Sequence, residues 1–138
     1  GVETAVPGAV TAVDAGLVRV QVATVGLTAL LTDPATAPPG VGSEVLVCIR
    51  AEDVALELPD RSRPTSPRNH LPATVTAVTV DGALVRVDLD AGFGLTAYIT
   101  RPALAELGLV PGTPVVAAVK GPAVHLISRG PATPGPPA

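Results

Sequence analysis

The sequence predicts an all-β protein of two small antiparallel β-barrels in tandem, with about five strands each. The first observation behind this prediction is composition. The chain of 138 residues is 47% hydrophobic, yet it has one Phe, one Tyr, no Trp and no Met, so its core must be aliphatic. Val-rich segments with frequent Gly and Pro favour short strands and tight turns over long helices. The second observation is an internal repeat of about half the chain.

The repeat preserves both the order and the approximate spacing of its segments. The matching pairs are VPGAVTAV at 6–13 with LPATVTAV at 71–78, LVRVQV at 17–22 with LVRVDL at 84–89, GLTAL at 26–30 with GLTAY at 94–98, and GSEVLVCIRAEDVAL at 42–56 with GTPVVAAVKGPAVHL at 112–126. A unit this small cannot cover the edges of an open sheet. We therefore expect each unit to close its sheet into a barrel, which removes those edges.

The strands are predicted from residue alternation. In the first unit, Val18, Val20 and Val22 alternate with Arg19 and Gln21. This period of two is typical of a strand with one buried face. The corresponding stretch of the second unit shows the same alternation, so each unit is expected to contain it as a strand.

Turn and helix signals complete the second unit. Residues 81–82, Asp-Gly, predict a hairpin turn, because Gly readily adopts a positive φ. One short helix is expected where Thr100 can cap the first turn, Pro102 lies within that turn and Gly108 can end the segment. The first unit has a Pro-rich loop, TDPATAPPG, at the same place.

These signals give a domain organisation. We expect a first barrel at 1–58, a linker at 59–68, a second barrel at 69–128 and a disordered tail at 129–138. The linker is rich in Pro and charge, and the tail has nothing apolar to bury.

Several functional classes are disfavoured by composition. The net charge of −3 and the pI of about 5.2 argue against a nucleic-acid or anionic-membrane surface, and only Phe93 and Tyr98 could stack on bases. No apolar run is long enough to span a bilayer, and no signal peptide is present. Cys48 is the chain's single cysteine, so no internal disulfide is possible, and it is interpreted as a buried strand residue, which fits a reduced, cytoplasmic setting. His70 and His125 are interpreted as structural or solvent-facing.

The chain also lacks the motifs of an enzyme. It contains no Walker A loop, no Gly-x-Ser-x-Gly and no Cys, His or carboxylate set at metal spacing. We therefore expect no catalytic residues and no metal site.

One polar feature remains, which is the distribution of cations. The chain has eight arginines but a single lysine, Lys120, and Arg68 lies in a Ser-Pro-Arg-Asn turn. Two interpretations are open: each is a plain surface or linker charge, or the two converge on an anion. A tetrahedral dianion needs about two cationic partners, together with hydroxyl and backbone N–H donors, to replace its hydration shell. Thr65 and Ser66 offer the hydroxyls.

The segment from TSPRN to VVAAVKGPAVHLI resembles a Mop domain, whose hallmarks are a Ser-Ala-Arg-Asn turn, a Leu-Gly-Leu-x-x-Gly element and an Ile-Lys-Ala-Ser strand end. The stretch VCIRAEDVALEL resembles the regulatory TOBE region of ABC-transporter ATPases. The resemblance implies tandem OB-like barrels that bind molybdate or tungstate, with no other cofactor. The implied oxyanion site is Thr65, Ser66, Arg68, Asn69, Lys120 and Gly121.

The same resemblance implies a setting. The chain is expected to be the regulatory domain of a molybdate-type ABC importer ATPase, feeding back on transport from the cytoplasmic face of the membrane. The chain starts without Met, as an excised piece would. Expected partners are an upstream ATPase domain, permease subunits and a second copy in a homodimer, with no nucleic acid and no membrane insertion. The alternatives are a structural dimerisation module with a decayed site and a free-standing molybdate storage protein.

The sequence departs from the family pattern at three places. Pro67 replaces the Ala of the turn and so removes one backbone N–H donor. Gly121 and Pro122 replace the Ala-Ser that follows the lysine, which removes a hydroxyl. Glu3 stands in the first unit where Arg68 stands in the second, and a carboxylate there would repel a dianion. The first unit is therefore expected to lack a site.

Overall fold

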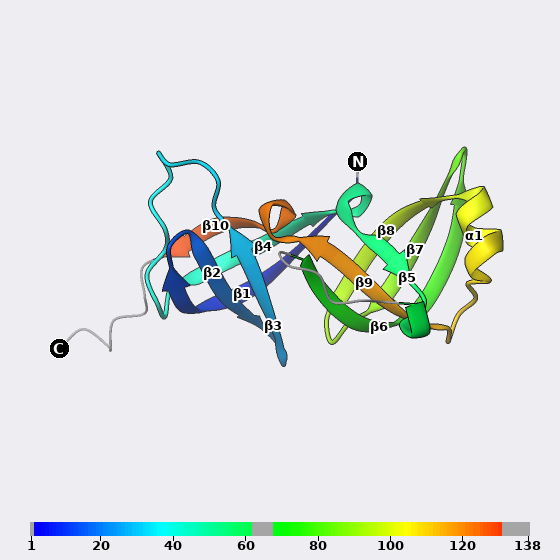
Figure 1. The fold of residues 1–138 in the computed structure, drawn as a ribbon, viewed down its shortest axis with the longest axis horizontal. Helices are drawn as coiled ribbons and strands as arrows, with labels where there is room; N and C mark the ends of the chain where they lie inside the picture. Colours follow the sequence, from blue (N-terminus) through cyan, green and yellow to red (C-terminus); the bar gives the residue numbers. More distant parts are fainter. Residues whose placement is uncertain (1, 62–67, 131–138) are drawn as a thin grey trace.

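In the computed structural model, which describes residues 2–61 and 68–130, the chain forms two five-stranded antiparallel sheets that lie side by side as two lobes (Figure 1). The first lobe contains, in sheet order, β10 (His125–Gly130), β4 (Glu44–Arg50), β1 (Glu3–Asp14), β2 (Leu17–Val22) and β3 (Val25–Leu30). The second contains β5 (Ala55–Glu57), β9 (Pro114–Lys120), β6 (Arg68–Asp81), β7 (Leu84–Asp90) and β8 (Gly94–Thr100). The expected all-β class with two OB-like units is confirmed.

The two lobes exchange one strand each. Strand β5 follows the strands of the first lobe in sequence but pairs with β9, with Ala55 opposite Ala118. Strand β10 follows the second lobe but returns to pair with β4, with His125 opposite Cys48. The hydrogen-bonded sheets therefore cross the boundary that the sequence repeat places at residue 58. Residues 129 and 130, which were expected in the tail, belong to β10, and the rest of the expected tail, residues 131–138, lies outside the described residues.

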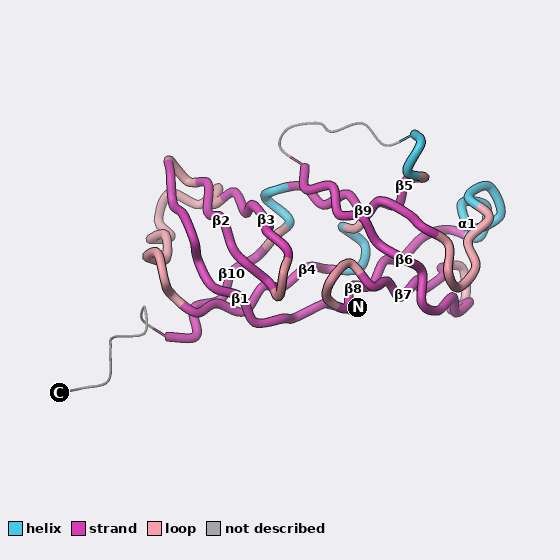
Figure 2. Tube along the Cα trace, turned by 90° about the horizontal axis from the view of Figure 1, so that it is seen from below, coloured by secondary structure: helices cyan, strands magenta, loops and turns pink. Residues whose placement is uncertain are grey.

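Short 3-10 helices connect each exchanged strand to the strand that precedes it in the other lobe. Segment η1 (Ala51–Asp53) joins β4 to β5 and packs against β8, whereas η3 (Gly121–Ala123) joins β9 to β10 and packs against β3. Figure 2 shows both segments between the lobes. A third, η2 (Pro59–Arg61), follows β5. The chain crosses between the lobes immediately after Lys120, and this places the candidate site beside the junction.

The expected helix is present as α1 (Arg101–Leu107), at the far end of the second lobe. The Thr100 side chain accepts a hydrogen bond from the Ala103 N–H at 3.2 Å, as an N-cap does. Gly108 ends the helix in the left-handed region, with φ 64 and ψ 38. The N-cap and stop signals read from the sequence are thus confirmed.

Alternating valines build the core, as predicted. Val18, Val20 and Val22 are at most 2% exposed, while Arg19 and Gln21 face solvent. The buried apolar side chains of both sheets form one cluster that continues across the junction. This continuity makes the two lobes one packed unit.

The hairpin turns need positive φ angles. Gly82 has a φ of 64, as its sequence context predicts. In the first lobe the β1–β2 turn is made by Ala15 with a φ of 49 and Gly16 with a φ of 84. An alanine in the left-handed region is strained, because its Cβ approaches the following carbonyl oxygen.

Candidate functional site

The register of β6 against β9 brings two cationic positions together. Arg68 begins β6 and lies directly opposite Lys120, the last residue of β9. Opposed residues of an antiparallel pair have Cα atoms about 4.5–5.5 Å apart. Like charges at directly opposed positions destabilise a sheet. The register therefore sets an arginine and a lysine at directly opposed backbone positions at the ends of these two strands.

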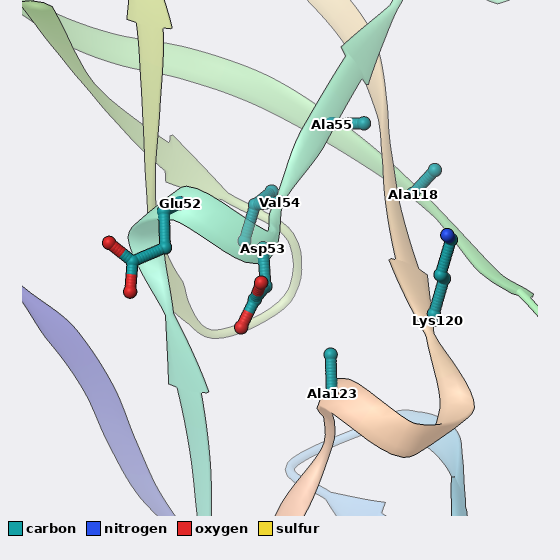
Figure 3. Close-up of a pocket in the computed structure, with 7 residues that line it drawn as sticks. All are labelled: Glu52, Asp53, Val54, Ala55, Ala118, Lys120 and Ala123. Carbon is teal, nitrogen blue, oxygen red and sulfur yellow. The ribbon is translucent and has the colours of Figure 1, made fainter.

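Lys120 stands at the edge of a hollow of about 260 Å³ between η1, β5 and β9 (Figure 3), which we call the Lys120 hollow. Its lining residues are Glu52, Asp53, Val54, Ala55, Ala118, Lys120 and Ala123. Ala55 and Ala118 are directly paired across β5 and β9, and their small side chains leave the space open. Glu52 and Asp53 stand across the hollow from Lys120 in Figure 3. Within the described part of the chain no ion pair joins them to the ammonium group.

Asn69 follows Arg68 and reaches across the junction between the lobes. Its Oδ1 accepts a hydrogen bond from the Thr28 N–H at 2.8 Å. Its Nδ2 donates to the Thr28 carbonyl oxygen at 2.9 Å and to the Val119 carbonyl oxygen at 3.1 Å. A side-chain amide has two N–H donors, so both are engaged with backbone. Asn69 thereby joins β6 and β9 of the second lobe to β3 of the first.

The repeat gives this contact a counterpart on the other side of the junction. Thr4 occupies in β1 the position that Asn69 occupies in β6, and Thr96 is the repeat equivalent of Thr28. The Thr96 N–H donates to Thr4 Oγ1 at 3.2 Å, within the buried part of the molecule. The two contacts are thus equivalent in place, but the asparagine makes three hydrogen bonds where the threonine makes one.

The charged residues next to these two cross-lobe contacts differ between the lobes. In the first lobe, Glu3 lies opposite Arg50 in the register of β1 and β4. These two side chains and those of Val2 and Glu52 line a second hollow, of about 240 Å³. The first lobe therefore opposes a carboxylate to a cation where the second opposes two cations. This contrast distinguishes the two repeat positions as possible anion sites.

The remaining expected site residues are placed as follows. Thr65 and Ser66 lie outside the described residues. Gly121 is buried in η3, and its carbonyl oxygen accepts a hydrogen bond from the Val124 N–H at 3.2 Å. The register and the chain direction thus bring Arg68, Asn69, Lys120 and Gly121 to one end of the β6–β9 pair.

Sequence reasoning missed two groups at this site, which are the acidic residues across the Lys120 hollow and the backbone of Thr28. Their repeat contexts were visible in the sequence. Thr28 lies in GLTAL and Thr96 in GLTAY, and each faces the start of the other lobe's long strand. This repeat context indicates a contact only once the exchange of strands between the lobes is known.

The histidines and the cysteine lie in the strands that flank the site. His70 Nδ1 is 4.0 Å from Glu57 Oε2, with β9 between their strands. His125 is exposed on β10, opposite Cys48. Burial, and secondarily the Glu3 carboxylate, raises the pKa of the Cys48 thiol. Cys48 is 3% exposed, which confirms its interpretation as a buried strand residue.

The described residues contain no group of three or more His, Cys, Asp or Glu side chains that could hold a metal ion. No helix in that part of the chain has the length and apolar character needed to cross a bilayer.

Curated relatives match parts of the chain. The molybdate/tungstate import ATP-binding protein WtpC of Pyrococcus horikoshii is 39% identical over 90 residues, which are 64% of this chain and 26% of that protein. The molybdenum import ATP-binding protein ModC of Aromatoleum aromaticum is 45% identical over 86 residues, 59% of this chain and 22% of that protein. The chain thus spans about a quarter of the length of these relatives.

Two further similarities are to proteins named for molybdenum or molybdate binding. The molybdenum-pterin-binding protein MopA of Rhodobacter capsulatus is 44% identical over 68 residues, 48% of this chain and 26% of that protein. The solved structure of the cytoplasmic molybdate-binding protein ModG, with molybdate bound, superposes with a TM-score of 0.74 and 28% identity, covering 89% of this chain and 94% of ModG. The family model that matches is the TOBE domain, over residues 65–126. Residues 65–126 of this chain thus match the TOBE domain family, in agreement with the resemblance found in the sequence.

Proposed function

We propose that this chain binds molybdate or tungstate at the paired ends of β6 and β9, and that this binding regulates an oxyanion importer. The observation that carries the proposal is the register that sets Arg68 opposite Lys120. Like charges at opposed positions of a sheet are unfavourable, and a tetrahedral dianion bound between them would neutralise both.

In this proposal each residue has a distinct part. Arg68 and Lys120 supply the two positive charges, Thr65 and Ser66 supply hydroxyl donors, and the backbone at Gly121 supplies a further N–H. Proteins bind such anions with charge-assisted hydrogen bonds, which contribute about 1.5–3 kcal/mol each. Pro67 lacks an N–H, so the site has one donor fewer than the Mop pattern offers.

The choice of ligand is supported by the names of the relatives. WtpC and ModC are named as import ATP-binding proteins for molybdate, tungstate or molybdenum, and ModG was solved with molybdate bound. By this similarity the chain is the non-catalytic regulatory part of an importer ATPase. The ATPase domain, the permease subunits and a second copy in a homodimer are its partners, on the cytoplasmic face of the membrane. Bound oxyanion then restrains transport as feedback.

A free-standing molybdate-binding protein is the second candidate, and one observation favours it. Both lobes superpose on ModG, which is named as a cytoplasmic molybdate-binding protein, with a TM-score of 0.74. The reading frame upstream of Gly1 separates the two candidates. An in-frame ATP-binding cassette with a Walker A motif supports the regulatory domain, and its absence supports the free-standing protein.

Calorimetric titration of the chain with sodium molybdate tests the binding itself. We expect a dissociation constant of about micromolar or better. Arg68→Ala and Lys120→Ala should each weaken binding by roughly tenfold to a hundredfold, since each removes a charge-assisted bond. Arg50→Ala is the matched control, because Arg50 occupies the repeat position of Lys120 but faces Glu3. No heat from the unaltered protein at millimolar molybdate would refute oxyanion binding and leave a structural dimerisation module.

A further inference from the structure

The side chain of Asn69 connects the two cation-bearing strand ends to the opposite lobe. We propose that Asn69 is a positioning residue that couples oxyanion binding at the Arg68–Lys120 pair to the junction between the lobes. This inference rests on the proposed function and deepens it. It assigns to Asn69 a part other than direct contact with the ligand.

The hydrogen bonds of Asn69 fix both strands at once. Asn69 is the neighbour of Arg68 on β6, and Val119, whose carbonyl oxygen it contacts at 3.1 Å, is the neighbour of Lys120 on β9. The same amide is bonded to both the N–H and the carbonyl of Thr28, at 2.8 and 2.9 Å. Asn69 thus pairs with β3 as a strand backbone would. One side chain holds the site's two strand ends in register with a third strand from the other lobe.

This contact matters because the cations stand where strands begin and end. Arg68 is the first residue of β6 and Lys120 the last of β9, and terminal pairs of a ladder separate more easily than central ones. Like charges at opposed positions of a ladder also favour such separation. Holding the ends together before the ligand arrives lowers the ordering cost of binding, which increases affinity.

Coupling of this kind must act in both directions. If the contact between Asn69 and Thr28 strengthens oxyanion binding, bound oxyanion must strengthen that contact by the same factor. The Thr28 N–H, which donates to Asn69 Oδ1, therefore reports occupancy of a site in the other lobe. Binding in the second lobe is thus expected to stiffen the first at β3.

The repeat provides a matched control for this coupling. Thr4 makes the equivalent cross-lobe contact with the N–H of Thr96, but it stands beside Glu3 and Arg50 instead of two cations. Truncation of Thr4 should destabilise the junction without changing oxyanion affinity. A purely structural role for Asn69 would give Asn69→Ala and Thr4→Ala the same phenotype.

The test is molybdate titration by calorimetry of the full chain, with melting temperatures measured on the same samples. We expect Asn69→Ala to bind molybdate about tenfold more weakly than the unaltered protein. Thr4→Ala should stay within about twofold of it, although both variants melt earlier. Equal affinity of Asn69→Ala and the unaltered protein overturns the inference and leaves the proposed function standing. If the unaltered protein binds no molybdate, the proposed function and this inference fall together.

A second measurement decides the matter if Asn69→Ala does not fold. Residue-resolved amide hydrogen exchange is followed in the unaltered protein with and without saturating molybdate. Coupling predicts that molybdate slows exchange of the Thr28 N–H roughly fivefold or more beyond any change at the Thr96 N–H. Equal changes at the two amides contradict the inference.

Discussion

Replacement of Gly92 by alanine tests how closely the two lobes pack. Gly92 lies in the β7–β8 turn of the second lobe with a φ of +89, and a Cβ added there would stand 2.6 Å from Val25 Cγ2 of the first lobe. Two costs therefore combine. The left-handed backbone costs an alanine about 1–2 kcal/mol, and forcing an extra methyl into a packed contact costs about 1–3 kcal/mol. Gly92→Ala should lower the free energy of unfolding by roughly 2–5 kcal/mol.

Gly82→Ala isolates the backbone cost, because Gly82 has a φ of +64 and nothing within 4 Å of an added Cβ. It should lose only about 1–2 kcal/mol. Urea denaturation followed by circular dichroism measures both losses from the transition midpoints. In a Val25→Ala background the cost of Gly92→Ala should fall to that of Gly82→Ala. Equal losses for Gly92→Ala and Gly82→Ala in the unaltered background would refute the close contact between the lobes.

Three further predictions concern single features of the fold. Ala15→Asn should raise the free energy of unfolding by about 0.5–1 kcal/mol, because an Asn-Gly pair suits a hairpin turn with two positive φ angles; thermal denaturation measures it, and an unchanged midpoint counts against strain at Ala15. Thr100→Ala should destabilise the chain by about 1 kcal/mol through the lost cap of α1, measured in the same assay with Thr100→Ser as control. Burial raises the pKa of the Cys48 thiol, so a disulfide reagent at pH 8 should label the thiol slowly in the folded protein and quickly in urea. The raised pKa also makes a contribution to stability that is fully present below the unfolded thiol's pKa of about 8.5. That contribution is lost as the pH rises through the pKa of the folded protein.

The strands and the helix could be predicted because their signals are local. Alternation of valine with polar residues at 18–22 directly specifies which face is buried, and Thr100 and Gly108 mark the two ends of a helix. The internal repeat then doubles the evidence for every strand. The number of strands in each repeat unit therefore predicts two five-stranded sheets without any knowledge of distant contacts.

The strand exchange could not be predicted, because local sequence does not choose between the two possible partners. Residues 55–57 and 125–127 occupy the same place in the repeat, and the edges of β4 and β9 both present apolar residues to them. Cys48 faces His125 in one sheet and Ala118 faces Ala55 in the other. The direction in which η1 and η3 leave the sheets decides the pairing, and the sequence carries no sign of that direction.

Only part of the candidate site could be predicted from the sequence, because some of its contacts are made by backbone atoms. Arg68 and Lys120 were found as candidates because they are the charged members of a resembling motif, and the register sets their backbones opposite each other. The role of Asn69 in the junction was hidden, since its partners are backbone atoms of Thr28, 41 residues away, and of Val119, 50 residues away. A hydrogen bond to a backbone atom does not depend on which side chain the partner residue has, so the sequence does not reveal the partner.

The two repeat positions also allow the central electrostatic argument to be tested without any ligand. Glu3→Arg would set two arginines opposite each other in the first lobe, in the arrangement that Arg68 and Lys120 have in the second. The attraction between Glu3 and Arg50 would be replaced by repulsion, which at an exposed cross-strand pair amounts to about 0.2–1 kcal/mol. Glu3→Gln separates the loss of attraction from the gain of repulsion.

Thermal denaturation of both variants at low and high salt makes the comparison. Glu3→Arg should be the less stable variant in dilute buffer, and about 1 M sodium chloride should remove most of the difference, because the Debye length then falls to about 3 Å. If Glu3→Arg is as stable as Glu3→Gln at low salt, charges opposed at this register do not interact measurably. The Arg68–Lys120 pairing would then give no physical reason to expect an anion between the strand ends, and the oxyanion proposal would depend on similarity to its relatives alone.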